Sequence, residues 1–191
     1  MLKRILLILM ILPAVGIAKD LSEKILLTES TIGGLPLSTT TQVSLADLQA
    51  QFSGYQVIEG FGQGDSPDFH YFEVLDSSQE LVLRMYGFGF SATNAQPQYP
   101  IDLLVVFSPR VIDQFGVSLG MTYHEVTQLR NGPFEFGANH FDNFLGAGKI
   151  WYGFDLNSTE NVPLNPEDFT VSDLRKNNPR VAAISWPSPR W

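Results

Sequence analysis

Two neighbouring runs of aromatic and branched residues constrain the fold of this chain most strongly. They cover Phe69 to Leu75 and Leu81 to Tyr86, and the five residues from Asp76 to Glu80 join them. Runs of this length and composition, bounded by turn-forming residues, are typical of β-strands, and a short polar connection brings two of them together as an antiparallel hairpin. The sequence therefore predicts a hairpin over 69–86 within a larger sheet.

Other runs of the same kind indicate that strands outnumber helices. Glycine and proline mark loops at 60–67 and 87–100, and residues 130–148 have the composition of an irregular segment. We predict an α+β fold with a mainly antiparallel sheet and two or three short helices packed on one face. The further predicted strands are Ile25–Leu27, Thr31–Leu35, Tyr55–Glu59, Ile101–Phe107, Lys149–Leu156 and Val181–Trp186.

Capping residues predict where the helices begin. Thr122 and Glu125 form a T-x-x-E capping box, in which each side chain satisfies a backbone N–H of the other residue. Asp47 replaces the glutamate of such a box in the first predicted helix. The predicted helices with their N-cap residues are 45–52 after Ser44, 123–129 after Thr122 and 166–174 after Asn165.

The first eighteen residues have the pattern of a secretory signal peptide. Two basic residues precede the apolar run Ile5–Leu12, and Gly16 and Ala18 place small side chains ahead of the predicted cleavage point. The apolar run is much shorter than the roughly 20 residues that span a bilayer. We expect residues 1–18 to be removed, which leaves residues 19–191 as a single globular domain in the periplasm or the medium.

The predicted mature chain is acidic and has no cysteine. The leader holds two of the 12 Lys and Arg residues and none of the 20 Asp and Glu residues, so 10 basic residues remain against 20 acidic ones. This balance disfavours binding to nucleic acid and to anionic lipid surfaces. The absence of cysteine excludes thiol catalysis, cysteine-ligated zinc and a lipid-modified N-terminal cysteine. We expect no cofactor, since no phosphate-binding or dinucleotide fingerprint occurs.

Several short motifs are spread over most of the predicted domain. They are Ile32-Gly33, Leu45–Phe52 with Gly54-Tyr55-Gln56-Val57, Tyr71–Leu75, Gly116–Thr122, Glu125-Val126, Ile150-Trp151-Tyr152 and Ile184–Pro187. In this order they resemble an uncharacterised bacterial envelope family, a domain of unknown function typified by sigma-E-regulated outer-membrane lipoproteins. The resemblance implies an exported α+β domain with no catalytic residues to carry over. The chain departs from the family pattern in lacking the lipid-carrying cysteine and a cysteine pair after the second helix.

The start of the second predicted helix carries another resemblance. Gly120-Met121-Thr122 with Glu125-Val126 is similar to the helix start of β-lactamase-inhibitor-like modules and of small outer-membrane assembly lipoproteins. Those modules bind other proteins and are not enzymes. The resemblance therefore implies a binding role, and it adds inhibition of an envelope enzyme as an alternative.

Histidine and acidic residues offer one candidate metal or acid–base site. Asp68 and His70 share a face if they lie in a strand, and His140 is a candidate third ligand from a loop. This group predicts a small periplasmic hydrolase or a metal-binding protein. The ordinary alternative is that His70 is a half-buried strand residue and Asp68 a polar residue at the start of the strand. No nucleophile motif occurs, so we assign no catalytic residues.

Two pairs of phenylalanines are candidate binding residues. Phe88 and Phe90, and likewise Phe134 and Phe136, place bulky rings in predicted loops, which is typical of recognition surfaces. The ordinary alternative is that these rings cover the sheet and fill the core. A binding role requires an exposed patch on the order of several hundred Å². Together these observations predict a non-enzymatic exported protein that binds a protein or another component of the cell envelope.

Overall fold

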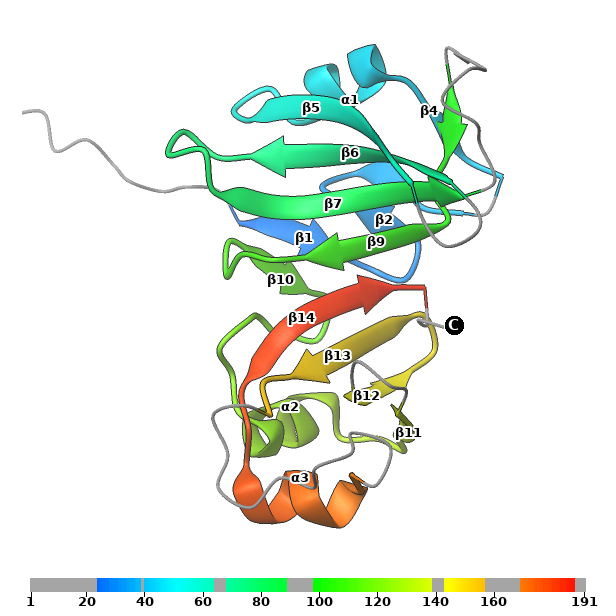
Figure 1. Ribbon diagram of the computed structural model, residues 1–191. Helices are drawn as coiled ribbons and strands as arrows, with labels where there is room; N and C mark the ends of the chain where they lie inside the picture. Colours follow the sequence, from blue (N-terminus) through cyan, green and yellow to red (C-terminus); the bar gives the residue numbers. More distant parts are fainter. Residues whose placement is uncertain are drawn as a thin grey trace, which may run out of the picture.

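An eight-stranded antiparallel sheet runs from one end of the molecule to the other in the computed structural model, which describes residues 24–38, 40–63, 68–88, 98–138, 143–156 and 169–187 (Figure 1). The sheet confirms the predicted α+β class and the predicted hairpin. Its strands, in spatial order, are β11 (Glu135–Ala138), β12 (Asn143–Ala147), β13 (Ile150–Phe154), β14 (Val181–Trp186), β9 (Leu103–Val106), β7 (Leu81–Phe88), β6 (Phe69–Leu75) and β5 (Gln56–Gly62).

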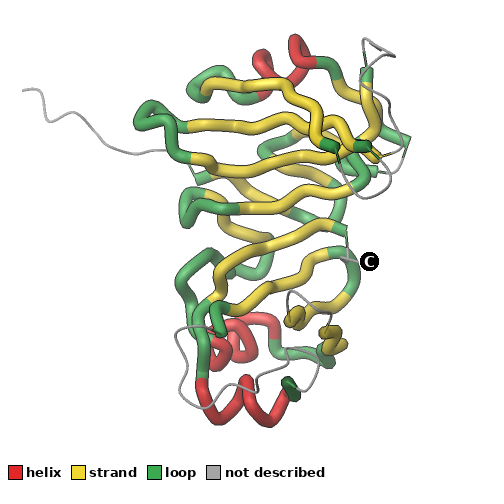
Figure 2. Tube along the Cα trace, in the orientation of Figure 1, coloured by secondary structure: helices red, strands yellow, loops and turns green. Residues whose placement is uncertain are grey.

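Smaller elements surround this sheet. A four-stranded sheet lies behind it in Figure 1, and a two-stranded ribbon and three helices complete the described part of the chain. The four-stranded sheet contains β10 (Val111–Asp113), β1 (Ile25–Leu27), β2 (Thr31–Ile32) and β3 (Leu35–Pro36); the ribbon pairs β4 (Gln42–Val43) with β8 (Tyr99–Pro100). Figure 2 shows the helices near the two ends of the large sheet: α1 (Leu45–Gln51) at the β5 end, and α2 (Tyr123–Arg130) and α3 (Val171–Asn177) at the other.

The inner face of the large sheet forms most of the hydrophobic core. Residues directly opposite one another on antiparallel strands share a face, so one row of side chains can be followed across all eight strands. This inner row is Val57, Val74, Leu83, Val106, Ile184, Tyr152, Leu145 and Phe136. All of its members except Phe136 are buried. Leu27, Ile32 and Val111 of the small sheet are fully buried as well and belong to the same core.

Three segments predicted as loops contain strand residues, so these predictions are wrong in part. Strand β5 continues to Gly62 and β7 to Phe88, where glycines had indicated loops, and segment 130–148 contains β11 and β12. Glycine signals a turn because it lacks a side chain. On β5 the rings of Tyr71 and Phe69 cover Gly60 and Gly62, and pairing with β6 continues through both glycines.

The first two predicted helices are confirmed with their capping boxes. Ser44 with Asp47 and Thr122 with Glu125 exchange the expected side chain to backbone hydrogen bonds. The third helix begins later than predicted, because Thr170 rather than Asn165 is the N-cap. Asp173 completes a third box there. The backbone N–H of Thr170 donates to Asp173, and the backbone N–H of Asp173 donates to the Thr170 hydroxyl, so this box satisfies two N–H groups at the start of the helix.

A buried polar group fastens α2 to the far half of the large sheet. The hydroxyl of Tyr152 on β13 donates to Asp113 Oδ2 (2.5 Å), and the other oxygen of Asp113 accepts from the backbone of Phe115 and Val117. Arg130 of α2 donates to the Tyr152 hydroxyl and to two backbone carbonyls. Burial, followed by the charge of Asp113, raises the pKa of Tyr152. The group is structural, since Tyr152 and Asp113 are buried, Arg130 is half-buried, and their polar atoms bond to one another or to the backbone.

Candidate functional site

The outer face of the large sheet carries large aromatic side chains beside the polar ones usual on a solvent-facing sheet surface. The row that crosses this face is Ile58, Glu73, Arg84, Val105, Ser185, Trp151, Gly146 and Glu135. Toward the β5 end, Phe69, Tyr71, Tyr86 and Phe88 lie on the same face and are half-buried. We call the part formed by these four residues with Glu73, Arg84 and Phe107 the aromatic face.

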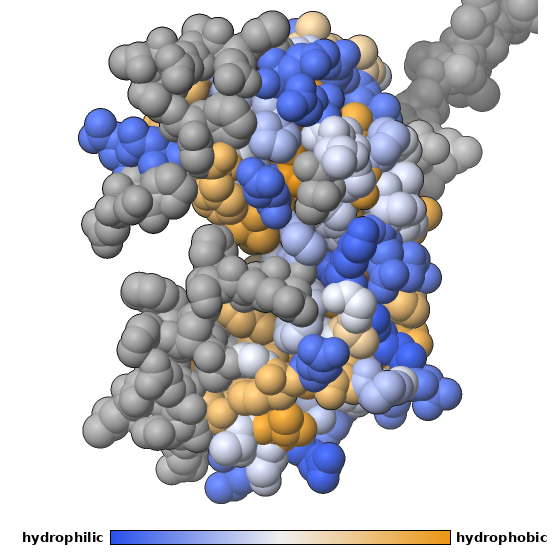
Figure 3. All heavy atoms as spheres, turned by 90° about the vertical axis from the view of Figure 1, so that its right-hand side faces the viewer, coloured by the Kyte–Doolittle hydropathy of each residue, from blue (hydrophilic) through white to orange (hydrophobic). Residues whose placement is uncertain are grey.

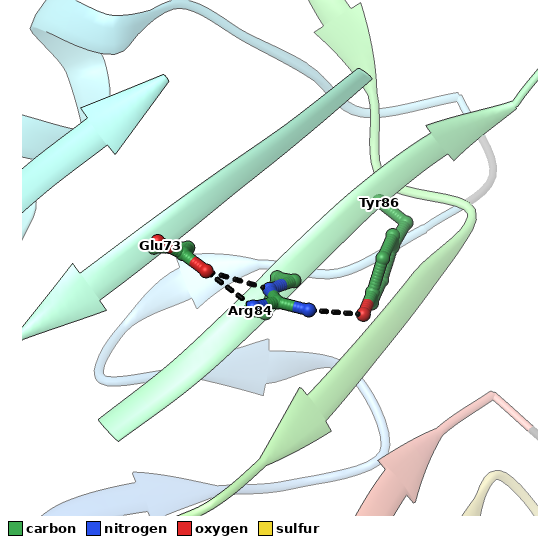
Figure 4. A network of polar contacts seen from close by, with 3 residues as sticks. All are labelled: Glu73, Arg84 and Tyr86. Carbon is green, nitrogen blue, oxygen red and sulfur yellow. Dashed lines mark hydrogen bonds and ion pairs between the residues drawn. The ribbon is translucent and has the colours of Figure 1, made fainter. Parts of the chain in front are cut away.

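An ion pair lies at the centre of the aromatic face. Glu73 of β6 and Arg84 of β7 are directly opposite each other, and Glu73 Oε1 accepts from both Nε (3.0 Å) and Nη2 of Arg84. Arg84 Nη1 also donates to the Tyr86 hydroxyl at 3.1 Å. Figure 4 shows the three side chains pointing toward one another from these two strands. Solvent reaches 31% of the Arg84 side chain and 21% of the Glu73 side chain, so the pair is accessible from outside.

Aromatic rings surround the guanidinium group. Its carbon lies 5.4 Å from the ring centre of Tyr71, 5.7 Å from that of Tyr86 and 5.8 Å from that of Phe107. These distances are within the range of cation–π attraction. Burial acts to lower the pKa of Arg84, but the hydrogen bonds to Tyr86 and Glu73 outweigh it and raise the pKa. Arg84 is therefore held in place as a permanent cation whose charge Glu73 balances.

Two glycines of β5 let rings of β6 lie down on the sheet. A Cβ atom at Gly60 would overlap the ring of Tyr71, and one at Gly62 would overlap the ring of Phe69. Each ring therefore covers the backbone of the glycine directly opposite to it on the neighbouring strand. Such covering compensates for the missing glycine side chain. It also leaves the other side of each ring turned away from the sheet.

The four predicted phenylalanines do not come together as one patch. Phe88 is part of the aromatic face, 6.5 Å from Phe69 between ring centres. Phe136 lies in the inner row, Phe134 packs against the core, and four strands separate β11 from β7. Phe90 lies outside the described residues. Of the three phenylalanines among the described residues, only Phe88 belongs to the aromatic face.

The predicted metal site is arranged differently from the sequence interpretation. His70 faces the interior, is 1% exposed, and its Nε2 is 3.0 Å from Oε1 of Glu59 on β5. Its ring stacks on Tyr99 with centres 3.5 Å apart. His140 lies outside the described residues, and within the described ranges no three His, Cys, Asp or Glu side chains form a metal-binding group. Asp68 precedes β6 and lines a hollow at the end of the β5–β6 pair.

The environment of His70 favours its neutral form. Burial lowers the pKa of His70 below the ordinary value of 6.5, and the hydrogen bond and charge of Glu59 oppose this shift only in part. His70 Nδ1 is buried and has no hydrogen-bond partner among the described residues. A second proton on this ring would therefore lack an acceptor. The chemistry of this site is that of a buried neutral imidazole held by one carboxylate.

Sequence reasoning missed Glu59, Glu73 and Arg84. Glu59 lies at the end of a predicted strand. Its closeness to His70 depends on the pairing of β5 with β6, and the last three residues of β5 belong to a segment predicted as a loop. Glu73 and Arg84 were placed in the predicted hairpin, and an opposite-charge pair across two strands is a recognisable signal. Recognising this pair required the correct register of the two strands of the hairpin.

Comparisons with known proteins identify a shared fold. No family model and no curated protein matches this chain in sequence. The structure is similar to the crystal structure of the uncharacterized protein YfeY from Escherichia coli, with a TM-score of 0.57 and 18% identity over 84% of this chain and 97% of that one. An identity this low supports an inference about fold and none about activity. Among the helices in the described ranges, none is both long and apolar enough to cross a bilayer.

Proposed function

We propose that this protein is an exported, non-catalytic binding protein of the cell envelope, and that the aromatic face is its ligand-binding surface. In this account residues 1–18 are a cleaved leader and residues 19–191 the working domain. The observation that carries the proposal is the placement of Tyr71 and Phe69, whose rings cover glycines beside a solvent-accessible ion pair.

The aromatic face differs from an ordinary solvated surface in a way that supports binding. The pattern of β6 and β7 places four large rings on the side of the sheet opposite the core, although polar residues at these positions would suffice for solubility. Aromatic and arginine side chains dominate the energetics of binding surfaces, because they offer large contact areas that lose little conformational freedom. The same two residue types form the aromatic face.

The buried histidine offers less support for the hydrolase alternative. A general base must come within hydrogen-bonding distance of the proton that it removes. The ring of His70 is 1% exposed, and aromatic rings of Phe61, Phe72 and Tyr99 pack against it. A substrate would have to displace these rings first. We therefore assign His70 a structural role.

A photo-crosslinking experiment in cells tests the proposed surface. Phe107 and Phe61 are matched positions, since they are 40% and 41% exposed and lie on opposite faces of the large sheet. Each is replaced in the exported full-length chain by p-benzoylphenylalanine, which reacts with nearby C–H bonds of proteins and sugars alike. We expect an adduct from the Phe107 position and none from the Phe61 position after irradiation. Equal labelling at both positions, or none at either, would contradict the proposal.

A further inference from the structure

We propose, as a refinement that rests on the proposed function, that the ligand of the aromatic face is an uncharged oligosaccharide. The sugar rings would stack on Tyr71 and its aromatic neighbours, and the sugar hydroxyls would bond to Arg84 and Glu73. Three properties of the face support this choice: its charge balance, its unused hydrogen-bonding groups and the orientation of its rings.

The charge balance of the face favours a neutral ligand. Glu73 already neutralises Arg84 through two N–H groups of the guanidinium. A phosphate or carboxylate ligand would have to compete with Glu73 for Arg84 in a chain whose net charge is −8. A cationic ligand would have to compete with Arg84 for Glu73. An uncharged ligand can bind without separating the pair.

The ion pair keeps hydrogen-bonding capacity of both kinds. An arginine side chain has five N–H donors, and Arg84 uses three of them in the described part of the structure. Glu73 Oε2 accepts no hydrogen bond from any described residue, whereas Oε1 accepts two. A sugar hydroxyl both donates and accepts, so neighbouring hydroxyls can use an arginine N–H and a carboxylate oxygen together. Hydrogen bonds to charged groups are the stronger class.

The arrangement of the rings suits a ligand with several small apolar surfaces. The outer ends of the Tyr71 and Phe69 rings lie over Gly60 and Gly62, and the planes of these two rings are inclined by 43° to each other. Phe69 and Tyr86 have ring centres 5.7 Å apart and planes inclined by 60°, so the rings form a contiguous but angled apolar surface. The C–H bonds on one side of a pyranose ring make a flat apolar surface that packs on an aromatic ring, while its hydroxyls point sideways. Inclined rings around a polar centre offer apolar contacts to successive sugar rings and hydrogen bonds to their hydroxyls.

A protein partner fits these observations less well. Binding hot spots between proteins are usually pockets that enclose an aromatic or arginine anchor. The aromatic face lies along the surface of β6 and β7, and the ring of Tyr71 covers the backbone of Gly60. The side of the molecule that lies at the right in Figure 1 carries hydrophilic residues interspersed with hydrophobic ones (Figure 3). Binding of a protein instead of a sugar is therefore one of the outcomes that the tests distinguish.

Titration with uncharged tetrasaccharides tests the inference. Purified protein is titrated with chitotetraose, cellotetraose and maltotetraose by calorimetry and by NMR of the labelled chain. We expect at least one sugar to bind saturably, to shift the signals of Arg84 Nε–H and the Tyr71 ring, and to leave α2 unaffected. Tyr71→Ala is expected to weaken binding at least tenfold, whereas Leu129→Ala, on the exposed surface of α2, should not change it.

The outcomes separate this inference from the proposed function. If none of the three sugars binds at millimolar concentration, or if Tyr71→Ala binds as well as the wild type, the oligosaccharide inference is overturned. NMR mapping on the wild type decides the question even if Tyr71→Ala does not fold. If no sugar binds but the Phe107 position crosslinks to a protein, the proposed binding function stands and the oligosaccharide inference is wrong. Failure of both experiments would remove both proposals.

Discussion

The ring of Tyr71 on β6 lies over the backbone of Gly60 on β5, in the space that any larger residue at position 60 would occupy. The two residues are direct cross-strand neighbours, so the glycine and the ring act as one unit of the sheet. Since Gly62 and Phe69 repeat the arrangement on the next outward-facing pair, the aromatic face is built into the strand register.

The dependence of this arrangement on Gly60 can be measured by a double-mutant cycle. Gly60→Ala should lower the free energy of unfolding by about 1 kcal/mol in the wild-type background, because the new Cβ displaces the Tyr71 ring. In a Tyr71→Ala background the same change should be neutral or stabilising by about 0.5 kcal/mol, since alanine loses less backbone entropy than glycine. Urea denaturation gives both values.

A matched control for this cycle is Gly54→Ala. Nothing lies within 4 Å of a Cβ at Gly54, so this substitution should shift stability by no more than about 0.5 kcal/mol in either background. An equal effect of Gly60→Ala with and without the Tyr71 ring would show that the ring does not rest on the glycine.

The Glu73–Arg84 pair should stabilise the fold modestly and in a salt-dependent manner. Both side chains are partly exposed, so we expect a coupling energy of about 0.5–1 kcal/mol from the cycle of Glu73→Gln and Arg84→Met. High salt should reduce it, because ions screen accessible charges. The measurement is denaturation of the four proteins at low and high ionic strength. A coupling energy of zero at low salt would contradict a stabilising contribution of the pair.

Acid should destabilise the protein through His70. The folded state favours neutral His70, because burial lowers its pKa, whereas the unfolded chain takes up the proton near the ordinary value of 6.5. The unfolded state therefore binds more protons as the pH falls through 6.5, and stability declines from there toward the lower pKa of the folded state. Each unit of difference between the two pKa values corresponds to about 1.4 kcal/mol.

Histidine variants isolate this effect. His70→Phe keeps a ring in the stack on Tyr99 and removes the titrating group, so stability should change little between pH 7 and pH 5.5. His124→Gln, on the exposed surface of α2, should retain the wild-type dependence. Urea denaturation at the two pH values measures the difference, and a His70→Phe protein that loses as much stability as the wild type would refute this role of His70.

The hydroxyl of the buried tyrosine Tyr152 on β13 should contribute to stability separately from the packing of its ring. Tyr152→Phe leaves Asp113 Oδ2 without its donor and takes one acceptor from Arg130, while the ring remains packed. Leaving a buried acceptor unsatisfied costs about 1–3 kcal/mol. The combined variant Tyr152→Phe with Asp113→Asn should be less destabilised than the sum of the single changes. Additive losses, measured by thermal or urea unfolding, would show that the two groups do not interact.

Much of the fold follows from local signals in the sequence. The hairpin over 69–86 and the capping boxes at Ser44 and Thr122 depend on residues close together in the chain, and each is present in the structure. The strands through Gly60 and Gly62 were not predictable in the same way. Their stability depends on rings from a neighbouring strand, and a glycine without knowledge of that neighbour signals a turn.

The candidate site was less predictable because a single irregularity sets its register. The pairing of β6 with β7 shifts between Val74 and Leu75, where Leu75 faces Leu81 and Val74 faces Leu83. Without this shift Glu73 would face Leu83, and Arg84 would point to the opposite side of the sheet. Phe88 could be recognised as a candidate from its residue type, whereas the ion pair beside it required the position of the bulge.

The most direct test of the account is whether the aromatic face is covered by a ligand in its native setting. Hydroxyl-radical footprinting compares the oxidation of Tyr71 and Tyr86 in intact cell envelopes with that in the purified protein, and half-buried Tyr55 beside α1 serves as the internal reference. The account predicts that oxidation of Tyr71 and Tyr86 falls relative to Tyr55 in envelopes. Unchanged ratios for both tyrosines would contradict it.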